Sequence, residues 1–211
     1  MDALGIKLKS ELEDFCSIEP KLKPYGSLKQ IESLDNATKE RILKQLALHR
    51  KIRESMGGLG YEDPEVTKKG LRMCLHEFGL KMAADITPYI KFGDIVEMYD
   101  SNFVQFHHNL VFYKYCSYEL IDVFVRPMHE LYSRPQEITD KIVSEALNIL
   151  NDPFGVKKIH VPQHRISEIY GDRRRMFNIQ LKFGTAVFDK NDRAVGFIST
   201  NTCTEATFHA V

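Results

Sequence analysis

The hydrophobic period changes twice along this chain, and the order of these changes strongly limits the folds it can adopt. Two short runs, IVEMYD and FVQFHHN, alternate with a period of two and flank the turn residues DSN at 100–102. A stretch without strand alternation occupies 110–150. Three further strand-like runs follow: KKIHVPQHRISEI, MFNIQLKFGTAVF and AVGFISTNTC. The pattern predicts two strands, then helices, then three strands.

The region before these strands has helical spacing. Pro20 and Pro24 are expected to break residues 4–34 into one or two short helices, because proline lacks the backbone donor. NATKERILKQLALHRKIRES reads as an amphipathic helix, with Asn36 or Thr38 as its N-cap. A further helix is expected across TKKGLRMCLHEFGLKM. We therefore divide the chain into an N-terminal helical segment, 1–90, and a second domain, 91–211.

The predicted order of elements has a structural consequence for the second domain. An antiparallel sheet of two early and three late strands, with the intervening helices on one face, encloses a space between helices and sheet. A small molecule could occupy that space. The fold class expected is α+β.

The stretch FVQFHHNLVFYKYCSYELIDVF carries a family resemblance. A strand ends at Asn109, the aromatic Phe112 follows three residues later, and Tyr118 precedes the acidic step at Asp122 and Val123. Asn109 could cap the helix that starts after the strand, and Phe112 is expected to pack inward. This spacing resembles that of PAS domains.

A second match lies near the C-terminal end. FDKNDRAVGFISTNTCTEA resembles the closing hairpin of a PAS domain: a strand, an acidic turn, a Val-Gly-aromatic strand and an exit signature. Thr202, Cys203, Thr204 and Glu205 occupy the exit positions. Together the two matches cover residues 92–205.

The resemblance implies a PAS-like five-stranded antiparallel sheet with helices on one face, preceded by the N-terminal helical segment. It also implies a sensory or regulatory signalling module, not an enzyme, that binds a small ligand or a protein partner and transmits through its flanking helices. PAS domains often dimerise through such helices, so we expect a homodimer and a downstream signalling protein as partners. The cofactor stays unspecified.

The pocket of such a module is expected to be lined by aromatic and long apolar side chains from the middle of the chain. The residues predicted to bind the ligand are Phe106, Phe112, Tyr115, Tyr118, Phe124, Met128, Leu131 and Phe183.

Two other classes of function stay open. The 13 Phe and 9 Tyr residues could fill the core completely, which would make this a ligand-free domain for protein interaction or dimerisation. Alternatively, a small α+β enzyme could use a pocket histidine and aspartate for proton transfer. That enzyme would need a buried carboxylate beside His107 or His108, with both groups facing one cavity.

The charge balance and the cysteines indicate which binding partners and which cellular compartment to expect. The 29 basic residues balance 29 acidic ones, so the overall field gives no strong signal for nucleic acid. No run approaches the roughly 18 apolar residues of a membrane helix. The four scattered cysteines form no CxxC pair and no signal peptide precedes them, so we expect free thiols in the cytoplasm. Adjacent His107 and His108 would face opposite sides of a strand, so no metal site is predicted.

Overall fold

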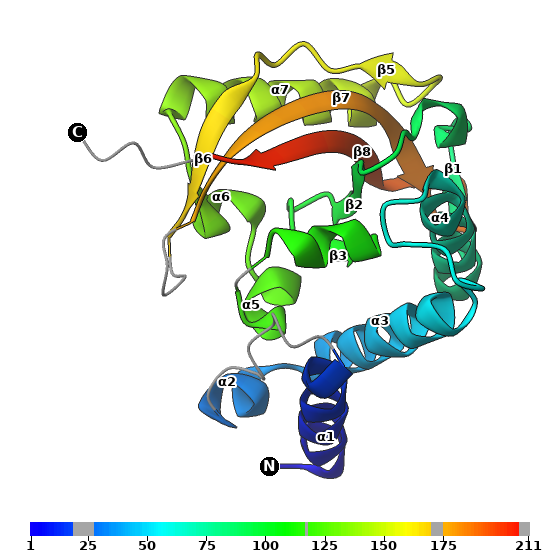
Figure 1. The fold of residues 1–211 in the computed structure, drawn as a ribbon, viewed down its shortest axis with the longest axis vertical. Coiled ribbons are helices and arrows are strands. Elements are labelled where there is room, and N and C mark those ends of the chain that lie inside the picture. The colour runs from blue at the N-terminus through cyan, green and yellow to red at the C-terminus, as the bar shows by residue number, and fades with distance from the viewer. Residues whose placement is uncertain (19–27, 117, 170–174, 207–211) are drawn as a thin grey trace.

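A curled antiparallel sheet forms the middle of the molecule in the computed structural model, which describes residues 1–18, 28–116, 118–169 and 175–206 (Figure 1). All five predicted strands form within it, and they are adjacent in the order β3-β2-β8-β7-β6. Their bounds are Ile95–Asp100 for β2, Gln105–His108 for β3, His164–Glu168 for β6, Met176–Phe188 for β7 and Ala194–Glu205 for β8.

Three two-residue strands enlarge the sheet beyond the five predicted strands. β1 (Lys81–Met82) and β5 (Lys157–Lys158) both pair with β7, while β4 (Tyr132–Ser133) pairs with β6. The sheet of the described residues therefore has eight strands. Such short segments carry too little alternation to be predicted from sequence.

Local turn chemistry explains the two hairpins. Asp100 Oδ1 accepts hydrogen bonds from the backbone N–H groups of Asn102 and Val104, at 2.8 and 3.0 Å, which closes the predicted β2–β3 turn. Asp189 Oδ1 does the same for Asn191 and Arg193 in the β7–β8 turn. The predicted exit residues, 202–205, are the last residues of β8 and remain paired with β7.

The helices begin where the capping residues allow. Asp35 caps α3, since its Oδ1 accepts from Thr38 N–H at 2.6 Å; the prediction of Asn36 or Thr38 as N-cap is wrong by one position or more. Asp63 caps α4, with Pro64 in the first turn. Pro20 and Pro24 lie outside the described residues. The helices are α1 (Ala3–Ile18), α2 (Leu28–Ser33), α3 (Asn36–Glu54), α4 (Pro64–Phe78), α5 (Leu120–Val125), α6 (Met128–Leu131) and α7 (Gln136–Asn151), with the 3-10 turns η1 (Thr87–Tyr89) and η2 (Leu110–Lys114).

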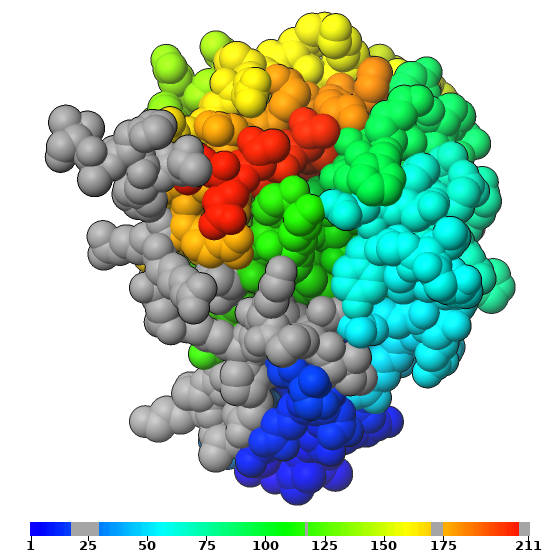
Figure 2. Space-filling model, viewed as in Figure 1, coloured from blue at the N-terminus to red at the C-terminus, as the bar shows by residue number. Residues whose placement is uncertain are grey.

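Helices contact both faces of the sheet. The intervening helix α7 covers one face, where its Ile149 shares a hydrophobic cluster with Ala186 of β7 and Phe197 of β8. The N-terminal helix α4 covers part of the other face, since Cys74 Sγ lies 3.8 Å from Met98 Sδ of β2. β8 and part of β7 reach the surface beside α4 (Figure 2). Part of the sheet thus lies between α7 and α4.

One hydrophobic core joins the N-terminal helices to the sheet. The same cluster contains Leu12 of α1, Leu46 of α3 and Leu71 of α4 together with Met98 and Ile198 of the sheet. All five side chains are buried. The two predicted segments therefore pack against each other through apolar side chains.

Asn109 has a different role from the one predicted. It precedes η2 but makes no side-chain capping bond there. Instead, its Oδ1 accepts from Val96 N–H, and its Nδ2 donates to Thr67 Oγ1 and to the carbonyl of Asp94 at 2.9 and 2.8 Å. Asn109 therefore ties α4 to the start of β2.

Within the described part of the chain, no helix is both long and apolar enough to span a bilayer.

Candidate ligand cavity and buried polar path

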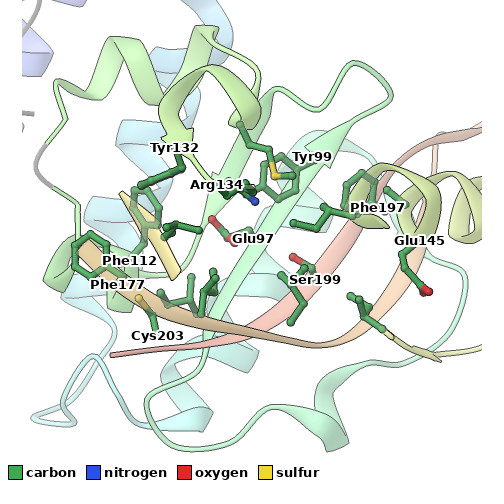
Figure 3. A pocket seen from close by; sticks show the side chains of 18 of the residues that line it. Glu97, Tyr99, Phe112, Tyr132, Arg134, Glu145, Phe177, Phe197, Ser199 and Cys203 are labelled. Carbon is green, nitrogen blue, oxygen red and sulfur yellow. The ribbon is translucent and has the colours of Figure 1, made fainter. Parts of the chain in front are cut away.

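A cavity of about 70 Å³ lies between the sheet and α7. Figure 3 shows its walls, with side chains that converge from β2, β7, β8 and the segment around β4. The lining is mostly apolar. It consists of Ile95, Glu97, Tyr99, Phe112, Tyr115, Met128, Tyr132, Arg134, Ile142, Glu145, Ala146, Ile149, Ile159, Ile166, Phe177, Ile179, Leu181, Phe197, Ser199 and Cys203.

The period of each element explains which of its residues reach the cavity. Alternate residues of a strand share a face, so β2 contributes 95, 97 and 99, and β7 contributes 177, 179 and 181. Helical spacing brings Ile142, Ala146 and Ile149 of α7 onto one stripe. The cavity is therefore built by regular elements and not by loops alone.

Glu97 is the buried acid of the cavity. Gln105 Nε2 donates to its Oε1 at 2.6 Å, and Asn201 Nδ2 donates to its Oε2. Burial raises the pKa of the Glu97 carboxyl above its usual value, although hydrogen bonds from Tyr99, Gln105 and Asn201 oppose the shift. Both carboxyl oxygens are thus held by protein donors.

Arg134 brings a half-buried positive charge to the same cavity. It follows β4, and Figure 3 shows its side chain beside Tyr99, on the side of the cavity where Glu97 lies. Its Nε is buried and makes no hydrogen bond within the part of the chain that the structure describes. Burial lowers the pKa of its guanidinium, but arginine stays charged in proteins. The charges of Tyr99, Tyr132 and Glu97 oppose this shift, but none of the described residues forms a hydrogen bond or an ion pair with the guanidinium.

Three of the eight predicted ligand-binding residues line this cavity: Phe112, Tyr115 and Met128. They come from η2, its C-terminal end and α6. Part of the predicted stretch 110–150 therefore lies against the sheet at this cavity.

The other five lie elsewhere in the core. Phe106 packs edge-on against Phe78 of α4, and Phe183 contacts Tyr89, with ring centroids 6.0 and 4.5 Å apart. Phe124 stacks on His108. The Tyr118 hydroxyl donates to the carbonyl of Leu131 and accepts from Ile169 N–H, which leaves it a structural role. Leu131 itself is buried in the main hydrophobic cluster.

The polar side chains Glu97, Arg134, Glu145 and Ser199 line the cavity but are not among the predicted ligand-binding residues. The alternation in IVEMYD does place Glu97 on the face of Ile95 and Tyr99, and that signal was available. Arg134 lies in the irregular segment YSRP, where no period indicates a direction. Its position depends on how β4 pairs with β6.

A buried polar path leads from the cavity to α3. We define this path by Glu97, Gln105, His108 and His49. Gln105 links the first two steps, because its Nε2 donates to Glu97 and its Oε1 accepts from His108 Nδ1 at 2.9 Å. His49 Nε2 of α3 then lies 2.8 Å from the carbonyl oxygen of His108. All four residues are buried.

Two further hydrogen bonds anchor the end of the path. Because the carbonyl of His108 can only accept, His49 Nε2 carries the proton and Nδ1 accepts from the Tyr113 hydroxyl at 2.5 Å. Gln45 Nε2 donates to His107 Nδ1 at 2.6 Å, whereas its approach to His49 Nε2 is no hydrogen bond, because both of those nitrogens are donors. α3 is therefore attached to β3 by polar contacts in an otherwise apolar interface.

Burial keeps the histidines of this interface neutral. It lowers the pKa of His49 to about 4, although the hydrogen bond to the His108 carbonyl opposes the shift. Burial likewise lowers the pKa values of His107 and His108 well below their usual value, and the neighbouring histidines add to the effect. None of these rings carries charge at neutral pH.

His107 and His108 do not line the cavity that Glu97 lines. Glu97 is the register partner of His108, but Gln105 hydrogen-bonds to both and separates them. The arrangement that the enzyme hypothesis requires, a carboxylate and a histidine facing one cavity, is therefore not formed by these residues.

The thiols and possible metal ligands contribute no reactive group. The four cysteines, Cys16, Cys74, Cys116 and Cys203, are buried and form no disulfide with one another, and burial raises the pKa of Cys203, which lines the cavity, to about 12. A protonated thiol is a poor nucleophile. Among the described residues, no cluster of three or more His, Cys, Asp or Glu is arranged to hold a metal ion.

The chain matches no protein-family model, and no curated protein matches its sequence.

Proposed function

We propose that this chain is a PAS-type sensory or regulatory module, without a catalytic step, that binds a small ligand in the cavity and transmits its occupancy through α3. The buried polar path carries this proposal, because it joins a cavity-lining group directly to a helix of the N-terminal segment. The apolar lining with few polar groups is typical of ligand pockets.

The strand arrangement supports the PAS assignment. Two early strands and three late strands form one antiparallel sheet, the first of them paired with the last. The intervening helices lie over one face and enclose the cavity. These are the features that the resemblance in residues 92–205 implies.

The path suggests how occupancy reaches α3. A ligand that displaces or hydrogen-bonds Glu97 changes the acceptor available to Gln105, and Gln105 in turn holds the His108 ring. His108 presents its carbonyl to His49 of α3. Because buried polar groups must keep their partners, a change at one end favours a compensating change at the other.

The first test is an absorption spectrum and a native mass spectrum of the full chain purified from cells. A retained small mass or a visible chromophore supports the proposed ligand-binding function. A colourless protein of bare mass favours the second candidate, a ligand-free interaction domain. The small cavity volume, about 70 Å³, is the observation that favours this candidate.

The second test interrupts the path. Gln105→Met preserves the side-chain length but removes the bonds to Glu97 and His108. In the parent chain, ligand release should change the hydrogen exchange of α3; in Gln105→Met it should not, although the ligand still binds. Gln163→Met, at an exposed position, is the matched control. An unchanged response of α3 in Gln105→Met would refute transmission along this path.

We also propose that the module dimerises and delivers its signal to a downstream protein. α1 leaves Ile6 57% exposed on the N-terminal segment, a surface position for a large apolar side chain. Light scattering of the full chain during size-exclusion chromatography tests the dimer, and Ile6→Asp should increase the monomer fraction. A monomeric parent chain at all concentrations would contradict dimerisation.

A further inference from the structure

The Nε atom of Arg134 is a charged donor that is out of contact with solvent and has no hydrogen-bond partner among the described residues, although the side chain as a whole is half-buried. The guanidinium of Arg134 forms no ion pair with any of the described residues. An ionised donor buried without a partner is strongly unfavourable, by several kcal/mol. A protein retains such a group most readily where a ligand completes it.

The acidic side chains nearby do not fill this role. Glu97 binds the amides of Gln105 and Asn201 and forms no ion pair with Arg134. Glu145, on α7, directs its carboxylate away from Glu97 and Arg134 (Figure 3). An anion that enters the cavity could therefore form an ion pair with the guanidinium of Arg134.

The remaining walls limit the rest of the ligand. Ile142, Ala146 and Ile149 of α7 face Phe197 of β8 across the cavity, so the body of the ligand contacts hydrocarbon. The volume of about 70 Å³ is less than half of the roughly 150 Å³ that accommodates benzene in an engineered protein cavity. A large or strongly hydrated anion does not suit these walls.

We infer that the cavity binds a short-chain monocarboxylate, with its carboxylate paired to Arg134 and its aliphatic body against α7 and Phe197. A planar carboxylate matches the two-pronged donor geometry of a guanidinium. The inference deepens the proposed ligand-binding function and rests on it.

The experiment measures binding to the full chain by calorimetry, with the sodium salts of acetate, propionate, butyrate, valerate and hexanoate. Butyramide and butylamine serve as the neutral and cationic analogues. Affinity should pass through a maximum along the carboxylate series, since the cavity has a fixed size. Butyramide should bind at least about tenfold more weakly than butyrate, because it lacks the charge that completes Arg134.

Variants at Arg134 give an independent readout. Arg134→Gln should weaken butyrate binding by at least about tenfold, the loss of a charge-assisted hydrogen bond. Arg134→Lys keeps the charge without the planar fork and should bind with intermediate affinity, which also preserves the test if Arg134→Gln fails to fold. Arg165→Gln removes an exposed charge from β6 and should bind like the parent.

Three results would overturn the inference: butyramide binding as well as butyrate, unchanged butyrate affinity in Arg134→Gln, or no binding in the whole carboxylate series. In each case a small mass retained in the native mass spectrum would still support the proposed function. A bare mass together with no binding would count against both.

Discussion

At the scale of single residues, Arg134 is expected to lower the stability of the ligand-free chain while it contributes to binding of the proposed carboxylate. Replacing it by methionine removes a half-buried charge whose Nε has no hydrogen-bond partner among the described residues, while the apolar walls accept the new side chain. We expect Arg134→Met to raise the free energy of unfolding of the ligand-free chain by about 1 kcal/mol, measured by urea titration. Arg165→Met, at an exposed site, should change it by less than about 0.5 kcal/mol. A destabilised Arg134→Met would show that the guanidinium is satisfied in the free protein.

His49 belongs to the same scale and makes stability depend on pH. Its pKa in the folded chain is about 4, below its ordinary 6.5, so the unfolded chain binds the proton more readily. The stability that depends on neutral His49 is fully present above pH 6.5 and is lost as the pH falls toward 4. At pH 4 the titration of His49 alone lowers the free energy of unfolding by about 3 kcal/mol. The free energy of unfolding, measured at intervals between pH 7 and 4, checks this.

The matched variants separate His49 from the other titrating groups. His49→Gln cannot titrate, so its stability should fall less steeply across this pH range than that of the parent. His160→Gln, at an exposed position, should leave the slope unchanged. Equal slopes in the parent chain and His49→Gln would rule out His49 as a source of the acid sensitivity.

At the scale of elements, the pairing of β2 with β8 depends on a glycine. A Cβ at Gly196 would lie 2.1 Å from the carbonyl oxygen of Tyr99, so β8 can approach β2 only without a side chain there. Gly196→Ala should destabilise the chain by about 1–3 kcal/mol in thermal or chemical unfolding. Gly60→Ala is the control, because among the described residues no atom other than those of its chain neighbours lies within 4 Å of its added Cβ. Equal stability of the two variants would mean that β2 moves away at little cost.

At the scale of the whole molecule, the shared core makes the predicted domain boundary testable. A fragment of residues 91–211 would expose Met98 and Ile198, which α4 and its neighbours cover in the full chain. We expect this fragment to unfold without a cooperative thermal transition and to bind a hydrophobic dye, whereas the full chain unfolds cooperatively. A cooperative transition in the fragment would show that the second domain folds independently.

The sequence by itself determined the order of strands and helices. The alternation in IVEMYD and the helical stripe from Ile138 to Ile149 are local patterns, and each element buries its apolar side accordingly. The turn at Asp100 is equally local, because the carboxylate bonds to its own neighbours. The alternation also places Glu97 beside Ile95 and Tyr99 on one face of a strand.

Only the tertiary structure decided what that face encloses. Arg134 reaches the cavity that Glu97 lines through an irregular segment, and His49 reaches His108 across 59 positions of sequence. No hydrophobic period in the sequence predicts either position. The position of Arg134 depends on how β4 pairs with β6, and that of His49 depends on how α3 packs against β3. For the same reason five of the eight predicted pocket residues lie elsewhere in the core: hydrophobicity indicates that a side chain is buried, but long-range packing decides which space it faces.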